Sequence, residues 1–308
     1  MATHTQSVGT RTCQTVAAIL AVAVGLVSAQ SPPQKIISLV PSVTEILFAI
    51  GAGSQLAGIG SFDQVPDGYD GAQLARVGGL LDPDMERIFT LRPDLVVLYS
   101  SQTDPGQQLE RAGIPVLAYK HGGLAEVSQT IRALGLRTGH SAQAESIAAD
   151  MEAGLAAIRA RVADRPKPRT LLVFGREPLT LRNIYASGGN GFLHDMLDAA
   201  GGVNVFASVA SENVAQVNSE AILASAPDVI IEIRYAKRFR EETVEDERAV
   251  WRRLSTLPAV RSDRIHFVTG NRFVVPGPGV VEATEELARI LHPGAFAIPR
   301  TPPEPAAE

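Results

Sequence analysis

Seven side chains suited to binding a charged, ring-bearing molecule stand at the ends of expected strands in this 308-residue chain. They are Ser42, Phe62, Tyr99, Arg176, Arg234, Tyr235 and Arg272. Ligands of open parallel sheets bind beyond the carboxyl ends of the strands. Guanidinium groups pair with carboxylates and stack on conjugated rings, so the three arginines favour an anionic, ring-bearing ligand. Phe62 and Tyr99 are suited to stacking from a facing surface.

Each of these positions also has a purely structural interpretation. An arginine here could form an ion pair with a neighbour such as Glu177 or Glu232, and Tyr99 could end a buried strand as a core residue. The grouping of the seven at strand ends favours binding, and it depends on where the strands end.

An internal repeat supplies a second pair of candidates. Glu86-Arg87-Ile88 is followed after four residues by Pro93-Asp94 and an apolar run, and Glu220-Ala221-Ile222 is followed at the same spacing by Pro227-Asp228 and another apolar run. Each copy predicts a short helix, a Pro-Asp break and a buried parallel strand. Singly, either glutamate would be a solvated residue near a helix start.

Around the repeat, apolar runs alternate with helical stretches, which predicts an α/β fold with mainly parallel sheets. Strands are expected near Ile36–Val40, Leu56–Gly60, Leu95–Tyr99, Val116–Tyr119, Thr170–Phe174, Val229–Ile233 and Ile265–Val268. Residues 141–164 are rich in Ala, Glu and Arg without proline, and predict one stiff helix between an N-terminal lobe (34–140) and a C-terminal lobe (167–292). The proline-rich residues 293–308 predict a disordered tail.

The N-terminal segment 1–29 predicts a cleaved secretory signal peptide. Its apolar run from Val16 to Val27 is too short for a membrane span of ~20 residues, and Val27-Ser28-Ala29 offers a small-residue cleavage pattern. The single cysteine, Cys13, would leave with the signal and lacks the surroundings of a lipoprotein site. We therefore expect a periplasmic protein that is not lipid-anchored.

Composition and motifs exclude several classes of function. A net charge of −5 disfavours nucleic acid, which needs a basic surface. The chain has no nucleophile elbow, P-loop, zinc-protease motif or Rossmann fingerprint. The histidines after His4 lack the close spacing of metal ligands, so we expect no direct metal site. A secreted α/β enzyme with catalytic groups assembled only in space remains an alternative.

The chain resembles the periplasmic binding proteins of cobalamin, haem and ferric-siderophore importers. The segments that carry the resemblance are Ile36 to Phe48 followed by Gly51, Glu86-Arg87-Ile88 with Pro93-Asp94-Leu95, Gly113-Ile114-Pro115-Val116, and Gly201-Gly202 with Asn204. Together they extend from about Lys35 to His292, which is nearly the whole chain after the signal segment.

The resemblance implies two Rossmann-like lobes joined by one long backbone helix, which limits opening between the lobes. It implies that Glu86 and Glu220 dock on arginines of an ABC permease, and that the protein is a monomeric binder without catalysis or a cofactor. The lobes would trap a metal chelate between them and deliver it.

Three cargoes fit the resemblance. Cobalamin binders share the motif layout, including Val173-Phe174-Gly175, although the tryptophans that they place around the corrin ring fall here on Leu80, Tyr99 and Val214. A ferric siderophore would use the arginines, since Arg234 falls where some siderophore binders contact their ligand. Haem is the third cargo, with an axial ligand such as Tyr99.

Overall fold

The computed structural model describes residues 31–209, 213–234 and 244–296. Among the predicted features, Tyr235, the signal segment 1–29 and the last twelve residues of the predicted tail lie outside these ranges. No helix in the described part of the chain is both long enough and apolar enough to cross a bilayer.

The N-terminal lobe contains one sheet of five parallel strands in the order β3-β2-β1-β4-β5. These strands are β1 (Ile36–Ser38), β2 (Leu56–Ile59), β3 (Ala75–Arg76), β4 (Leu95–Tyr99) and β5 (Val116–Tyr119). Its helices are α1 (Pro41–Ala49), α2 (Met85–Leu91), α3 (Thr103–Arg111) and α4 (Leu124–Thr138). Successive side chains of β4 enter two different cores, Leu95 and Val97 in one and Val96 and Leu98 in the other. Burial on both faces explains the unbroken apolar run.

The sheet of the C-terminal lobe is mixed, with the strand order β11-β10-β6-β7-β9 and β8 paired with β6. The strands are β6 (Arg169–Gly175), β7 (Ile184–Ser187), β8 (Val203–Asn204), β9 (Val214–Val217), β10 (Val229–Arg234) and β11 (Ile265–Thr269). Strands β8, β6, β10 and β11 pair in parallel, whereas β7 and β9 are antiparallel additions. The helices are α6 (Phe192–Ala199), α7 (Ser219–Ser225), α8 (Val244–Arg252), α9 (Pro258–Arg261) and α10 (Val280–Leu291).

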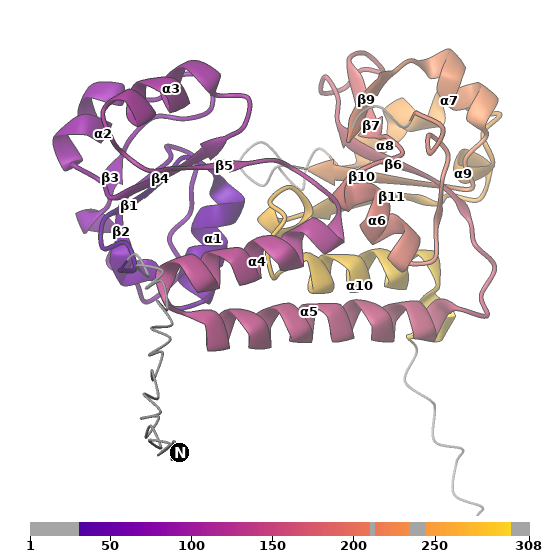
Figure 1. The fold of residues 1–308 in the computed structure, drawn as a ribbon. Coiled ribbons are helices and arrows are strands. Elements are labelled where there is room, and N and C mark those ends of the chain that lie inside the picture. The colour runs from indigo at the N-terminus through magenta and orange to yellow at the C-terminus, as the bar shows by residue number, and fades with distance from the viewer. Residues whose placement is uncertain (1–30, 210–212, 235–243, 297–308) are drawn as a thin grey trace, which may run out of the picture. The chain divides into compact units, whose positions relative to one another are not determined.

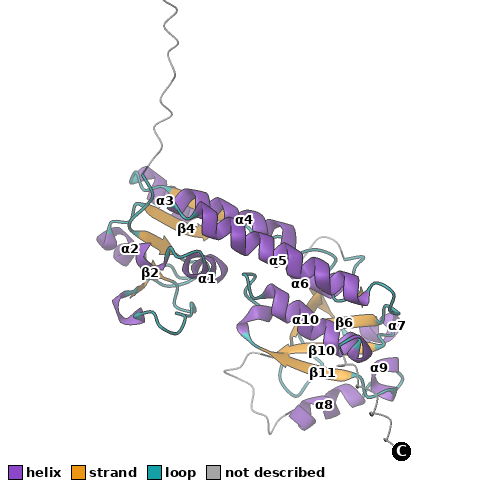
Figure 2. Cartoon of the chain, turned by 90° about the horizontal axis from the view of Figure 1, so that it is seen from below, coloured by secondary structure: helices purple, strands orange, loops and turns teal. Residues whose placement is uncertain are grey.

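One helix, α5 (Ser141–Val162), joins the two lobes and packs against α4, α6 and α10 (Figures 1 and 2). Its 22 residues span about 33 Å at 1.5 Å per residue. A stripe of buried side chains along it, from Ala144 through Met151 to Val162, faces those helices. Arg132 of α4 pairs with both Glu145 and Glu152 across the α4–α5 contact. The two-lobed α/β fold with one connecting helix is thus confirmed, and the helix ends two residues before the predicted 164.

The sequence repeat is also a repeat of structure. Asp84 and Asn218 cap α2 and α7 in the same way, each accepting from the backbone N–H three residues later. The aspartates of the two Pro-Asp breaks then accept hydrogen bonds from the residues that lead into β1 and β6: Asp94 from Lys35 N–H and Asp228 from Arg169 N–H. Each Pro-Asp break therefore also ties the following strand to its neighbour.

Part of the predicted disordered tail is ordered, which corrects that expectation. Residues Pro293–Ala295 form a 3-10 helix, and Phe296 lies beneath the guanidinium groups of Arg161 and Arg289 at 4.6 and 4.9 Å. Cation–π contacts with two arginines stabilise the position of Phe296. The proline content of the tail does not predict these contacts.

Candidate functional site

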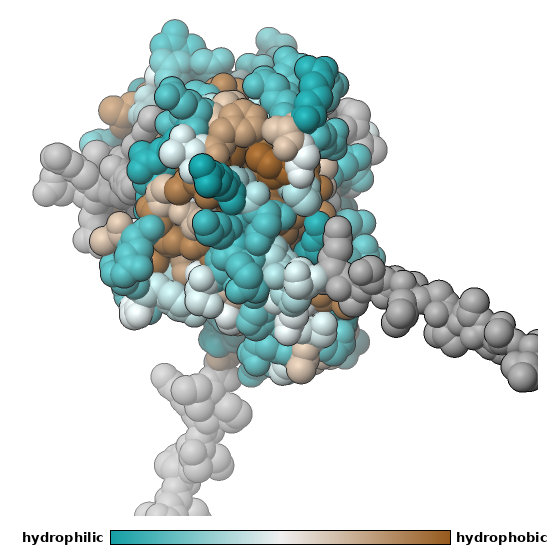
Figure 3. All heavy atoms as spheres, turned by 60° about the vertical axis from the view of Figure 1, so that its left-hand side comes forward, coloured by the Kyte–Doolittle hydropathy of each residue, from teal (hydrophilic) through white to brown (hydrophobic). Residues whose placement is uncertain are grey.

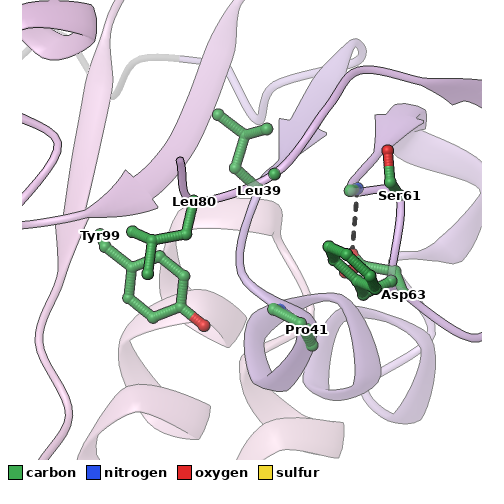
Figure 4. Close-up of a pocket in the computed structure, with 9 residues that line it drawn as sticks. Leu39, Pro41, Ser61, Asp63, Leu80 and Tyr99 are labelled. Atoms are coloured by element: carbon green, nitrogen blue, oxygen red, sulfur yellow. Dashed lines mark hydrogen bonds between the residues drawn. The ribbon is translucent and has the colours of Figure 1, made fainter. Parts of the chain in front are cut away.

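A hollow of about 100 Å³ lies at the carboxyl edge of the N-terminal sheet. Its walls come from the loops that follow β1 and β2, from Gly79 and Leu80 before α2, and from Tyr99 at the end of β4. Figure 4 shows Tyr99 and Asp63 on either side, with Leu39 and Pro41 between them. The hollow therefore occupies the place where parallel sheets bind ligands. A hollow of this volume has room for a side group of a ligand and not for a whole chelate.

Two of the residues that line this hollow, Phe62 and Leu80, are exposed apolar side chains, and the exposed Leu81 follows Leu80 in the chain. Phe62 is 82% exposed, Leu80 is 45% exposed and Leu81 is 94% exposed. The Phe62 ring leans over Gly79, where an added Cβ would lie 3.5 Å from the ring. Apolar side chains also gather between hydrophilic ones on the face that the N-terminal lobe turns forward in Figure 3. Side chains this large and exposed indicate a binding surface for an apolar ring.

Behind the rim, Tyr99 belongs to an aromatic cluster with Tyr119 and His121. The ring centroids of Tyr99 and Tyr119 both lie 5.3 Å from that of His121 and 6.0 Å from each other. Burial, with contributions from Tyr119 and Asp63, raises the pKa of Tyr99 to about 12. Burial also lowers the pKa of His121, whose Nδ1 has no hydrogen-bond partner among the described residues. Both side chains are therefore neutral at physiological pH.

Arg176 and Arg234 do not form the open cationic floor that the sequence predicts. Arg176 is fully buried and pairs with Glu232 at 3.1 Å and with Glu247 of α8 at 2.6 Å. Arg234 pairs with the same two carboxylates at 3.1 and 2.7 Å. Trp251 donates to Glu232 at 2.7 Å, which completes a buried and electrically balanced network.

The pKa values of the two carboxylates reflect this network. Burial raises the pKa of Glu232 against the pull of the arginines, while the two arginines outweigh burial and lower the pKa of Glu247. A buried guanidinium that is already paired with carboxylates is not available to pair with an anionic ligand. Arg176 therefore forms the ion pair with Glu232 that its structural interpretation predicts, and its buried side chain is not open to a ligand.

The remaining predicted residues are distributed differently. Arg272, in the loop after β11, is 41% exposed along its side chain and pairs with Glu286 of α10. Ser42 lies in the first turn of α1 and is only 2% exposed. Burial raises the pKa of Tyr119, and the interaction of its phenol with the Ser42 hydroxyl opposes that rise. Ser42 is thus a buried neighbour of the aromatic cluster.

Glu86 and Glu220 occupy equivalent places in the two lobes. Both are exposed residues in the first turn of capped helices, α2 and α7. The structure therefore presents a matched pair of acidic side chains, as the repeat predicts.

Sequence reasoning missed several residues of the edge, namely Asp63, Gln102, Tyr119, His121 and the exposed Leu81. Tyr119 ends an expected strand and carried the same signal as Tyr99. The buried Asp63 and Gln102 left no such signal, because their contacts are with loops that only the fold brings together. No group of three possible metal ligands exists in the part of the chain that is described.

Comparisons with known proteins agree with this architecture. A family model described as periplasmic binding protein matches residues 36–270. An uncharacterized ABC transporter substrate-binding lipoprotein of Bacillus subtilis, YvrC, is 30% identical over 275 residues, covering 88% of this chain and 83% of the relative. The vitamin B12-binding protein of Vibrio parahaemolyticus is 26% identical over 265 residues, covering 85% of this chain and 90% of its own length. The periplasmic heme-binding protein RhuT of Roseiflexus has the same fold, with a TM-score of 0.69 at 24% identity, over 86% of this chain and 99% of that one.

Proposed function

Because the chain belongs to the periplasmic binding protein family, we propose that its cargo is a corrinoid, the ring system of cobalamin, held against the carboxyl edge of the N-terminal sheet. The observation that carries this proposal is the group of exposed apolar side chains, Phe62, Leu80 and Leu81, at and beside a small hollow. A large ring with apolar faces and uncharged side groups matches such an edge better than a small anion does.

Family membership confirms the general function expected from the sequence. The chain is a substrate-binding protein of an ABC importer and not an enzyme, and its partners are a permease and a small-molecule ligand. Family membership also places the protein outside the cytoplasm. The identity of the cargo and of the residues that contact it is our proposal.

The charge balance of the C-terminal lobe disfavours a strongly anionic siderophore. Arg176 and Arg234 share two carboxylates, so the four charges cancel within a buried network. An anionic ligand that bound Arg176 or Arg234 would have to break one of these pairs and weaken the pairing of a buried carboxylate, which is costly. A ring whose side groups are amides avoids that cost.

Haem is the second candidate, and the aromatic cluster favours it. His121 has an unpartnered Nδ1 beside the phenol of Tyr99, and histidine and tyrosine are both axial ligands of haem iron. Against it, burial and the neighbouring Asp63 hold Tyr99 as a neutral phenol, whereas ferric iron binds the phenolate. A ferric-haem spectrum that changes in Tyr99→Phe or His121→Ala would favour this candidate.

The test is a calorimetric titration of the purified protein with cobalamin, cobinamide, haem and a ferric catecholate. We expect stoichiometric binding of a corrinoid, and Phe62→Ala to weaken it about tenfold through the loss of a stacked ring. Leu81→Ala should weaken it by a smaller factor. The matched control is Leu136→Ala, since Leu136 is a 78% exposed leucine on α4 away from the hollow. Equal effects of the two leucine variants, or tight binding of the catecholate alone, would contradict the proposal.

For delivery, we propose that Glu86 and Glu220 contact basic residues of the permease. Symmetric charges set orientation and association rate more than affinity, so the double reversal to lysine should abolish uptake while cargo affinity stays unchanged. Reversing Glu110, an exposed glutamate of α3 outside the repeat, is the control. Loss of cargo affinity in the double variant would place these residues in the binding site instead.

We further propose that the mature protein is a soluble monomer released by cleavage after residue 29. The proposal rests on the signal pattern of this chain alone. The Bacillus relative is named a lipoprotein, so its name does not support a protein without a lipid anchor. The intact mass of protein from a periplasmic extract should match a chain that begins at about residue 30. Recovery in the membrane fraction with an acylated Cys13 would contradict it.

A further inference from the structure

The turn after β2 sets an exposed ring beside a buried carboxylate. Phe62 is 82% exposed, whereas its neighbour Asp63 is 5% exposed. Both residues belong to a tight turn, Gly60–Asp63, in which Asp63 N–H donates to Gly60 O at 3.2 Å. Phe62 is therefore held out from the surface by a residue whose side chain points the other way.

Asp63 is bound from two elements. The hydroxyl of Thr44, a fully buried residue of α1, donates to Asp63 Oδ2, and Gly60 N–H donates to the same oxygen at 3.2 Å. Arg76 of β3 holds the backbone of the turn, with Nη1 at 2.9 Å from Gly60 O and 2.7 Å from Asp63 O. Two other elements of the lobe, α1 and β3, thus hold the four residues of the Gly60–Asp63 turn.

This arrangement is less favourable for folding than a turn without a buried carboxylate. Burial raises the pKa of Asp63 in spite of its hydrogen bonds and of Arg76. The second oxygen, Oδ1, is buried with no hydrogen-bond partner among the described residues, and an added Cβ at Gly60 would lie only 2.9 Å from it. A buried, partly unsatisfied carboxylate is unfavourable for folding. Its contacts rigidify the one turn that carries the most exposed aromatic ring of the edge.

We propose that Asp63, acting with Thr44 and Arg76, is a positioning residue that fixes the Gly60–Asp63 turn and so holds Phe62 ready for the cargo ring. This inference rests on the proposed function of the edge. A ring that is already in place loses little freedom on binding, which is the general advantage of preorganisation.

The first test is a double-mutant cycle measured by corrinoid affinity. Asp63→Ala should weaken binding about fivefold when Phe62 is present and leave affinity unchanged in a Phe62→Ala background, because the two residues act as one unit. Asp63→Asn keeps an acceptor for Thr44 and Gly60 and should restore most of the affinity. Equal losses in both backgrounds would overturn the proposal, since Asp63 would then act without Phe62.

The second test needs no ligand and separates this inference from the proposed function. Hydrogen exchange at the amides of Gly60 and Asp63 should accelerate at least about tenfold in Asp63→Ala as the turn opens. Asp70→Asn, a change to an exposed loop carboxylate that caps Ala72, is the matched control and should leave both amides unchanged. Unchanged exchange in Asp63→Ala would overturn the positioning role even if corrinoid binds. Accelerated exchange in a protein that binds no corrinoid would instead refute the proposed cargo.

Discussion

A hydrogen bond ties α4 of the N-terminal lobe to α6 of the C-terminal lobe, and its removal should loosen the contact between these helices. Leu124 N–H, at the start of α4, donates to Asp195 Oδ2 at 2.8 Å. The neighbouring Gly123 N–H donates to Glu126 of the same helix, also at 2.8 Å. One end of α4 is therefore capped twice, once from its own turn and once from the other lobe.

The two caps allow a matched comparison. Removing a side chain that caps a helix costs about 1 kcal/mol, with a range of roughly 0.5–2 kcal/mol. Asp195→Ala and Glu126→Ala should therefore lower the free energy of unfolding by similar amounts in urea titrations. Only Asp195→Ala should also broaden the distance between the lobes in the apo protein, measured between spin labels on α3 and α9.

Gly123 provides an independent check of the same contact. An added Cβ there would lie 2.2 Å from Asp195 Oδ2, so Gly123→Ala must displace that carboxylate. Its backbone angles suit alanine, with φ at −82°, and the damage should disappear in an Asp195→Ala background. An unchanged distance distribution in Asp195→Ala, or undiminished damage from Gly123→Ala in that background, would refute the role of this bond.

Three further predictions concern stability and are checked by chemical or thermal unfolding. Arg176→Met should cost about 3–5 kcal/mol because it leaves two buried carboxylates sharing the single guanidinium of Arg234, whereas the same change at the exposed Arg182 should cost under about 1 kcal/mol. Burial lowers the pKa of His292, so the unfolded chain binds this proton more readily; stability should fall as pH drops below about 6.5, and less steeply in His292→Gln. Gly78→Ala should be strongly destabilising, since its φ is +83° and its Cβ would lie 2.1 Å from a backbone oxygen.

The sequence predicts the central strands and the connecting helix well, for a physical reason. All seven expected strands are present within one or two residues at either end, because parallel strands buried on both faces need continuous apolar runs. The connecting helix follows from a long stretch without proline. The antiparallel β7 and β9 were missed because each has only four residues and shows neither a continuous apolar run nor a regular alternation of buried and exposed positions. Such short segments carry little periodic signal.

The binding edge was predicted less well, because the sequence does not show long-range pairing. Arg176 was placed correctly after a strand, yet its closest carboxylate belongs to Glu247, 71 residues further along the chain. Phe62 and Tyr99 do lie at the carboxyl edge as expected, since their positions depend only on where β2 and β4 end. Residue type and strand order predict a location, while charge neutralisation depends on the packing of α8.

The order of strand, loop and helix places the hollow and the proposed docking residue of the N-terminal lobe on one edge of the sheet. A helix that connects two parallel strands begins at the edge where the first strand ends, so α2 starts beside the hollow. The loop from Gly78 to Asp84 forms a wall of the hollow through Gly79 and Leu80 and then caps α2. Glu86 follows two residues later. A permease that bound Glu86 would therefore contact the helix start to which that wall is covalently joined.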